Sequence, residues 1–211
     1  MNAIPEEREL GARFDAALLF ATEAHRAQRR KFSGAPYVAH PLRVAALALE
    51  YGADEDVAVA ALLHDVVEDC GGLDATDKIR VEFGERVASI VLECSDSIAR
   101  DPTRKLPWSE RKRAFLLRAL EASDDALLVV GCDKLDNLAS LLRDLSRAED
   151  SEVVWRGFKG GRDGTANYYR SALNALERRN NPTAREIRPL VERLEASVGG
   201  KATNLFIDDR R

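Results

Sequence analysis

The sequence predicts an all-α fold, and two features of the residue pattern support this. Apolar residues recur at helical spacing along most of the chain, whereas the alternation typical of a half-buried strand is nearly absent. Residues that favour helix ends, such as Asp54, Gly84 and Ser123, separate these stretches. The 211 residues are enough for one domain with a sizeable core. We expect residues 1–180 to form that domain, and residues 181–211 to be a C-terminal helix and tail that packs on it or extends from it.

The first half of the chain predicts a series of helices. The first covers residues 6–29 and ends in a basic cluster, and the second covers residues 42–51 and stops at Gly52. A third is expected to run without interruption from its cap at Asp54 to Gly71 and Gly72. Shorter helices follow over residues 77–83 and 85–94. A turn at residues 33–36 precedes His40, which Pro41 places at the start of the second helix.

The second half predicts longer helices. A loop over residues 98–107 leads to a helix that Ser109 caps and that runs to Leu120. Ser123 caps a long helix over residues 124–147. The glycines between residues 157 and 164 indicate a flexible loop. Two further helices are expected over residues 167–178 and 182–198, followed by a tail.

Composition excludes several classes of protein. The formal net charge is -4, and this mild acidity argues against a protein that binds duplex nucleic acid. The longest apolar stretches, such as residues 57–63, are too short to cross a membrane, and residues 1–10 lack the pattern of a signal peptide. We therefore expect a cytoplasmic protein whose three widely spaced cysteines are reduced. The oligomeric state stays open, a homodimer included.

The sequence HDVVED at residues 64–69 concentrates the chemistry of the chain. On a helix, His64, Asp65, Glu68 and Asp69 would share one polar face, opposite the apolar residues of the segment. Burying three carboxylates and an imidazole without a cation would be strongly unfavourable. We therefore favour a metal site over the alternative, a solvated polar face.

Two imidazoles and two carboxylates could form such a site: His40, His64, Asp65 and Asp133. This mixed nitrogen and oxygen set suits Mn²⁺, Fe²⁺ or Zn²⁺, and leaves positions open for water and a substrate oxygen. Glu68 and Asp69 would orient that water or take its proton. Substrate phosphates would need counter-charges, for which the candidates are Arg30, Lys31, Lys112 and Arg113. The predicted reaction is phosphoester hydrolysis.

Several segments appear in a recognisable order between about residues 14 and 178. They include Arg29-Arg30-Lys31, Pro36-Tyr37-Val38-Ala39-His40-Pro41, Ala60-Ala61-Leu62-Leu63-His64-Asp65 and Asp133-Lys134-Leu135-Asp136-Asn137. Together they resemble the HD phosphohydrolase superfamily, and within it the hydrolase domain of the RelA/SpoT family and its small alarmone hydrolases. This resemblance implies a helical bundle with a metal site at its centre.

The resemblance also implies roles for particular residues. The metal, commonly Mn²⁺ with Fe²⁺, Zn²⁺ or Mg²⁺ as alternatives, would be held by His40, His64, Asp65 and Asp133. Glu68 and Asp69 would be catalytic. A phosphorylated nucleotide would be bound by Arg30, Lys31, Lys112, Asn137 and Tyr168. The implied reaction removes the 3′-pyrophosphate of (p)ppGpp and returns GDP or GTP.

The chain departs from the family's pattern at two places. Val130-Gly131-Cys132 replaces the Lys-Leu-Ala that commonly precedes the last metal aspartate, and Asp136, at a position often occupied by His or Tyr, adds negative charge near the site of a bound polyanion. We assign His25 a packing role. Two other functions stay open: an HD phosphatase of another nucleotide, such as a nicotinamide dinucleotide phosphate or a nucleoside phosphate, and a catalytically silent nucleotide-binding or helical interaction module.

Overall fold

The computed structural model describes residues 9–70, 72–96 and 106–200, although nothing is described of the side chains of Asp69 and Cys70. These residues fold as a helical bundle, which confirms the predicted fold class. The helices are α1 (Ala12–Ala24), α2 (Ala39–Glu50), α3 (Glu55–Leu63), α4 (Val66–Cys70), α5 (Gly72–Phe83), α6 (Glu85–Cys94), α7 (Trp108–Ala119), α8 (Asp124–Arg147), α9 (Ser151–Trp155), α10 (Gly161–Arg178) and α11 (Ala184–Val198). Within this part of the chain there is no strand, and no helix is both long and apolar enough to cross a membrane.

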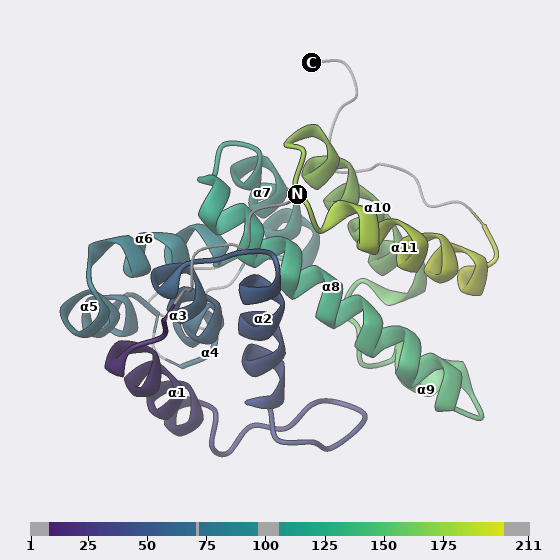
Figure 1. Ribbon diagram of the computed structural model, residues 1–211. Helices are drawn as coiled ribbons and strands as arrows, with labels where there is room; N and C mark the ends of the chain where they lie inside the picture. The colour runs from purple at the N-terminus through teal and green to yellow at the C-terminus, as the bar shows by residue number, and fades with distance from the viewer. Residues whose placement is uncertain (1–8, 71, 97–105, 201–211) are drawn as a thin grey trace, which may run out of the picture.

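Helix α8 lies between two groups of helices, with α1 to α6 on one side and α9 to α11 on the other (Figure 1). Two clusters of buried apolar side chains meet along it. Ala126, Val129 and Cys132 pack against the first group, whereas Leu127 and Leu138 pack with α7, α10 and α11. Because both faces of α8 are packed, the polar residues on its third face are held at fixed positions.

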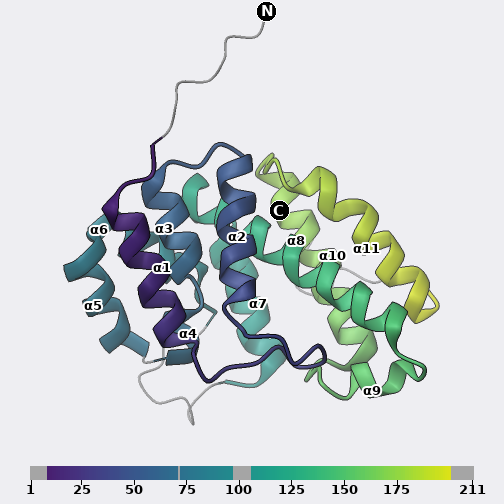
Figure 2. The ribbon, with the colours of Figure 1, turned by 60° about the horizontal axis from the view of Figure 1, so that its bottom comes forward.

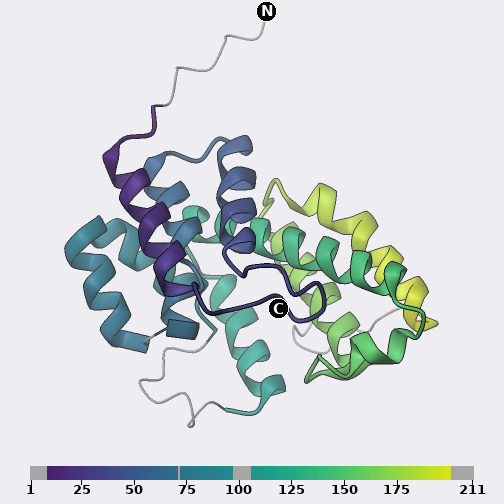
Figure 3. The same ribbon diagram turned by 90° about the horizontal axis from the view of Figure 1, so that it is seen from below.

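The segment between α1 and α2 carries the basic cluster to α8. It crosses beneath α2 towards α8 and α9 (Figures 2 and 3). Arg30 donates both guanidinium Nη groups to Asn137 Oδ1 at 3.1 Å, and Lys31 Nζ donates to the Gly157 carbonyl at 3.0 Å. These bonds place the basic residues beside the middle of the bundle, and not on the end of a helix that runs to residue 29, as the sequence had predicted.

Helices α6 and α8 have the bounds that the sequence predicts, and the residues at their starts explain the agreement. Ser123 Oγ accepts a hydrogen bond from the Ala126 backbone N–H at 3.2 Å at the start of α8. Gly84, at a φ of 95°, separates α5 from α6. Asp54 likewise caps α3, accepting from the Val57 N–H at 3.1 Å. Ser109, in contrast, is not the cap that the sequence predicts, because α7 begins one residue before it, at Trp108, with Pro107 at the N-cap.

The prediction of one continuous helix through HDVVED is wrong, because the helix breaks after Leu63 and resumes as α4. His64 Nδ1 lies 2.7 Å from the Ala61 carbonyl oxygen, which a continuous helix would pair with the backbone N–H of Asp65. At the break, the imidazole of His64 thus replaces a backbone N–H as the partner of the Ala61 carbonyl oxygen. The break places His64 and Asp65 at a helix junction, where both side chains turn towards α8.

The prediction of a flexible loop over residues 157–164 is also wrong in part. Helix α9 precedes it, and α10 begins at Gly161, six residues before the predicted start. A Cβ on Gly160 would lie 2.5 Å from the Trp108 ring, so glycine here permits close packing and does not mark flexibility. Helix α5 similarly begins five residues earlier than predicted, at Gly72. The loop predicted for residues 98–107 and the C-terminal tail fall largely outside the described residues.

The C-terminal helix α11 packs against α8 and α10 and buries Ile187, Val191 and Leu194. The residues that lead into α11 lie against α8, and this close approach explains why position 131 is a glycine. A Cβ on Gly131 would overlap Thr183 Oγ1 and lie 2.8 Å from Asn181 Oδ1. Asn181 cannot easily withdraw, because its Nδ2 donates to the Leu127 carbonyl at 3.0 Å. Glycine is therefore needed for this contact. The division of the chain at residue 180 stays a prediction.

We expect Gly131→Ala to lower the free energy of unfolding by about 1–3 kcal/mol, the usual range for an overpacked core. This loss would occur although alanine has the higher helix propensity. Urea denaturation measures it. Gly164→Ala in α10 is the matched control, because a Cβ there meets Trp108 carbons only at 3.5 and 3.7 Å. The control should be as stable as the wild type or more so, and equal stability of Gly131→Ala would contradict the close approach.

Candidate active site

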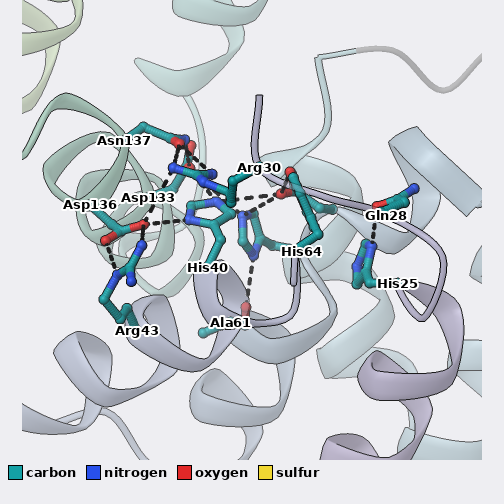
Figure 4. Close-up of polar contacts among 12 residues, drawn as sticks. His25, Gln28, Arg30, His40, Arg43, Ala61, His64, Asp133, Asp136 and Asn137 are labelled. Carbon is teal, nitrogen blue, oxygen red and sulfur yellow. Dashed lines mark hydrogen bonds and ion pairs between the residues drawn. The ribbon is translucent and has the colours of Figure 1, made fainter. Parts of the chain in front are cut away.

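Four predicted ligands from three parts of the fold come together beside α8 (Figure 4). His40 lies in the first turn of α2, His64 and Asp65 lie at the junction of α3 and α4, and Asp133 lies on α8. His40 Nε2 is 3.1 Å from Asp133 Oδ1 and 3.4 Å from Asp65 Oδ2. His64 Nε2 is 3.8 Å and 3.3 Å from the same two atoms. The ligand atoms of His40, His64 and Asp65 lie within 4.8 Å of one another.

Both imidazoles are held so that Nε2 faces this cluster. The Nδ1 atom of His64 is paired with the Ala61 carbonyl, and that of His40 lies 2.6 Å from Asp136 Oδ2. A carbonyl or carboxylate beside Nδ1 favours the proton on that nitrogen and leaves Nε2 as a ligand. Both Nε2 atoms are buried without a hydrogen-bond partner in the described residues. Two orphaned nitrogens beside two carboxylate oxygens therefore fit a divalent cation.

The charges of the cluster lead to the same conclusion. Burial opposes protonation of His40, but the neighbouring carboxylates of Asp133, Asp136 and Asp65 outweigh it and raise its pKa well above the usual value. Burial likewise opposes protonation of His64, and the charge of Asp65 raises its pKa. For Asp133, burial favours the neutral acid, yet Lys134 and the two histidines hold the pKa well below its usual range. Without a cation, protonated histidines balance the carboxylates.

Glu68 lies one turn after Asp65, on α4, and is only partly exposed. Burial and the negative charge of Asp96 raise the pKa of Glu68 to about 7, with Lys112 opposing them. Asp96 stays ionised because Arg111 and Lys112 contact it at 2.5 and 2.6 Å. Glu68 can thus gain or lose a proton near neutral pH. Asp69 was predicted to act with it, but its side chain lies outside the described part of the structure.

A cavity of about 370 Å³ lies next to the cluster. Five of the six residues predicted to bind substrate line it, namely Arg30, Lys31, Lys112, Asn137 and Tyr168, whereas Arg113 is not among the lining residues. Arg29 and Lys134 add two more cationic side chains, whereas Asp144 is the single acidic residue among those lining it. Phe32, Trp108 and Phe158 supply aromatic surface. This combination suits a ligand with several negative charges and an aromatic ring.

Two side chains join the cavity to the metal-ligand cluster. Tyr37 lines the cavity and donates its hydroxyl to Asp65 Oδ2 at 2.7 Å. Asn137 also lines it and donates to Asp133 Oδ1, while its own oxygen accepts from Arg30. A ligand that contacts Tyr37 or Asn137 therefore lies within one side chain of the proposed metal ligands.

Sequence reasoning assigned no role to several residues that hold the site. Tyr37 and Lys134 stand within the recognised segments and Asp96 follows α6, but nothing in the sequence indicates which neighbour each would contact. Lys134 is buried and donates to Asp133 Oδ2. Arg43 and Asp136 form an ion pair behind His40. The spacing offers a partial signal, because Arg43 follows His40 by three positions, as Asp136 follows Asp133.

His25 does not join the cluster. It is buried, its Nδ1 lies 2.7 Å from Gln28 Oε1, and its ring lies 5.0 Å from the Tyr37 ring between centroids. This position agrees with the packing role expected for it.

Cys94 and Cys132 form no disulfide with each other.

Comparisons with known proteins identify the family of this chain. A family model described as HD domain matches residues 17–166. The guanosine-3′,5′-bis(diphosphate) 3′-pyrophosphohydrolase MESH1 of Xenopus tropicalis is 42% identical over 137 residues, which is 61% of this chain and 72% of that protein. The human MESH1 is also 42% identical, over 132 residues, and the match spans 66% of its length.

A bacterial relative and two solved structures extend the comparison. A guanosine-3′,5′-bis(diphosphate) 3′-pyrophosphohydrolase of Aquifex aeolicus is 41% identical over 123 residues, or 17% of its own length. The structure of a metazoan ortholog of SpoT, described as hydrolysing ppGpp, superposes with a TM-score of 0.69 at 29% identity, covering 92% of this chain and 99% of that one. A Listeria monocytogenes structure gives a TM-score of 0.62 at 32% identity, covering 74% and 97%.

Proposed function

This chain belongs to the HD domain family, and on that premise we propose that it is a metal-dependent hydrolase of (p)ppGpp. It would remove the 3′-pyrophosphate, so that ppGpp and water give GDP and pyrophosphate, and pppGpp gives GTP and pyrophosphate. The convergence of His40, His64, Asp65 and Asp133 beside a basic cavity is the observation that carries this proposal. The relatives named for this reaction supply the substrate class.

The cation proposed for the site is Mn²⁺. Two imidazoles and two carboxylates form a donor set that suits Mn²⁺ and accepts Fe²⁺ or Zn²⁺ as well, with Mg²⁺ the least matched to nitrogen ligands. When bound, such a cation supplies Lewis-acid polarisation and a water of lowered pKa. The fit rests on the two orphaned Nε2 atoms, which have no better partner among the described residues.

The surrounding residues would divide the remaining work. Glu68 would hold or accept the proton of the attacking water, since its pKa of about 7 allows both states. Asp69, on the same short helix, is proposed to assist it. Arg30, Lys31 and Lys112 would bind phosphate oxygens, because they line the cavity and carry fixed positive charge.

Asn137 and Tyr168 would position the nucleotide. Asn137 lies between Arg30 and Asp133, so a ribose or phosphate oxygen that contacts it is close to the proposed cation. Tyr168 is buried, and its ring faces Lys112 Nζ at 5.2 Å from the centroid. We propose that the protein acts in the cytoplasm, where this nucleotide would be met.

The direct test of the proposed function is product analysis. Purified protein is incubated with Mn²⁺ and ppGpp, and pyrophosphate and orthophosphate are measured separately. Pyrophosphate together with GDP is expected. Orthophosphate as the sole product would reject this reaction in favour of a phosphatase acting on another nucleotide, for which nicotinamide dinucleotide phosphates and nucleoside phosphates form the comparison panel. Mn²⁺ binding without turnover of any substrate would indicate a silent binding module.

Mn²⁺ affinity should depend on pH. The pKa of His40 is raised well above its usual value, so the metal-free site carries a proton on this ring at neutral pH, and the pKa of His64 is shifted in the same direction; a cation must displace such protons. The dissociation constant for Mn²⁺ should therefore rise as pH falls, by about tenfold per pH unit for each proton released. Calorimetry in buffers of different ionisation enthalpy, from about pH 6 to 8, measures both the affinity and the protons. A constant affinity with no proton release would contradict the assignment of these histidines.

A further inference from the structure

Asp136 lies on α8 one turn after Asp133, and its carboxylate is buried behind His40 (Figure 4). Oδ2 lies 2.6 Å from His40 Nδ1 and accepts from Arg43 Nη2 at 3.2 Å, while Oδ1 accepts from Arg43 Nε. Arg30 Nη2 is 4.0 Å from Oδ2. His40 and Arg43 lie three positions apart on α2, and Asp133 and Asp136 lie three positions apart on α8. These two pairs of side chains contact each other.

These contacts determine which groups the negative charge of Asp136 interacts with. The carboxylate is engaged by an imidazole and two guanidinium groups, and Asp136 is absent from the residues that line the cavity. The sequence suggested that Asp136 would add negative charge near a bound polyanion. In the structure, that charge is directed at His40 and offset by Arg43.

A carboxylate beside Nδ1 has a specific effect on a metal-binding histidine. It favours the proton on Nδ1, makes Nε2 the ligand and fixes the plane of the ring. His40 Nε2 is the atom that faces Asp65 and Asp133, at 3.4 and 3.1 Å. The Arg43 guanidinium binds both oxygens of Asp136 in the planar, two-bond geometry that orients a carboxylate.

We propose that Asp136 is a positioning residue for cation binding: it accepts a hydrogen bond from His40 Nδ1 and holds Nε2 towards Asp65 and Asp133, and Arg43 holds Asp136. The inference rests on the proposed function only in taking His40 as a metal ligand. Arg43 and Asp136 act through His40 and touch neither the cavity nor the reacting atoms.

The test compares Mn²⁺ affinity, measured by electron paramagnetic resonance, in wild type and Asp136→Ala. The variant should bind Mn²⁺ about 10- to 100-fold more weakly, the usual effect of removing the partner of a ligating histidine. Glu195→Ala is the matched control, since Glu195 is also a buried carboxylate bound by two guanidinium nitrogens, those of Arg170 at 2.8 and 2.6 Å, away from the cluster. Its Mn²⁺ affinity should equal that of the wild type.

A second readout separates positioning from a loss of stability. In ¹⁵N-labelled protein loaded with diamagnetic Zn²⁺, the Nδ1 proton of His40 should give a slowly exchanging downfield resonance. The resonance should disappear in Asp136→Ala and return in part in Asp136→Asn, whose side-chain oxygen can still accept. Arg43→Gln, a change at a half-exposed side chain, should weaken Mn²⁺ binding more than the control does.

Several outcomes would overturn the proposal. Wild-type Mn²⁺ affinity in Asp136→Ala would do so, as would an equal loss in Glu195→Ala. If Asp136→Ala does not fold, unchanged affinity in both Asp136→Asn and Arg43→Gln has the same force. Failure of the proposed function can be distinguished from failure of this inference. If the wild type binds Mn²⁺ but releases no pyrophosphate, the proposed function fails and the affinity comparison can still be made. If the wild type binds no cation, both the proposed function and the role of Asp136 are contradicted.

Discussion

Replacing Asp65 by alanine is expected to abolish cation binding and pyrophosphate release together. Its Oδ2 is the atom that lies 3.4 and 3.3 Å from the Nε2 atoms of His40 and His64, and it also accepts the Tyr37 hydroxyl. Loss of a residue that merely supports a ligand weakens metal binding about 10- to 100-fold, so loss of the ligand itself should exceed that range. Calorimetry with Mn²⁺ and an assay of pyrophosphate release from ppGpp measure the two losses.

Asp77→Ala serves as the control for this change, because Asp77 is a highly exposed aspartate on α5. It should bind Mn²⁺ and turn over substrate as the wild type does. Full Mn²⁺ affinity in Asp65→Ala would remove Asp65 from the ligand set. Lost activity with retained affinity would instead assign Asp65 to a later step.

Replacing Glu68 by glutamine should leave Mn²⁺ bound while kcat falls by at least about 10²-fold, the usual effect of removing a general acid or base. Glutamine keeps the size of the side chain but removes the charge that faces Arg111 Nη1, which lies 3.8 Å from Glu68 Oε1. It cannot gain or lose the proton that a pKa near 7 makes available to Glu68. The effect should therefore appear in kcat at saturating substrate.

Glu85→Gln is the matched control for Glu68→Gln, since Glu85 is a largely exposed glutamate at the start of α6. Parallel Mn²⁺ titrations and turnover assays of the two variants distinguish the possible roles. Unchanged turnover in Glu68→Gln would exclude Glu68 from the proton transfer. Loss of Mn²⁺ from this variant would indicate a ligand and not a base.

The sequence predicts the helices whose ends are determined locally, and fails where a distant contact decides. Ser123 fixes the start of α8 through its own side chain, so the 24-residue helix was predicted in full. Gly160, in contrast, packs against the Trp108 ring from another helix, whereas the glycines around it predict a loop. The break before α4 involves a single imidazole bond from His64, a rotamer choice that helical periodicity does not reveal.

The proposed site shows the same division. Its four metal ligands stand in recognisable segments, so their convergence could be expected before the fold was seen. The pairing of Asp136 with Arg43 spans 93 positions and depends on how α2 crosses α8. On sequence alone, Asp136 looked like an unfavourable charge beside a polyanion. Only the relative placement of the two helices shows that its carboxylate faces His40.

The measurement that tests the account most directly is the position of Mn²⁺ in crystals of the protein, located by anomalous scattering. We predict a single strong peak within bonding distance of His40 Nε2 and an Asp133 carboxylate oxygen at the same time, with His64 and Asp65 completing the protein ligands. A peak that contacts only one of the two helices α2 and α8, or no peak near them at saturating Mn²⁺, would contradict the proposed metal centre.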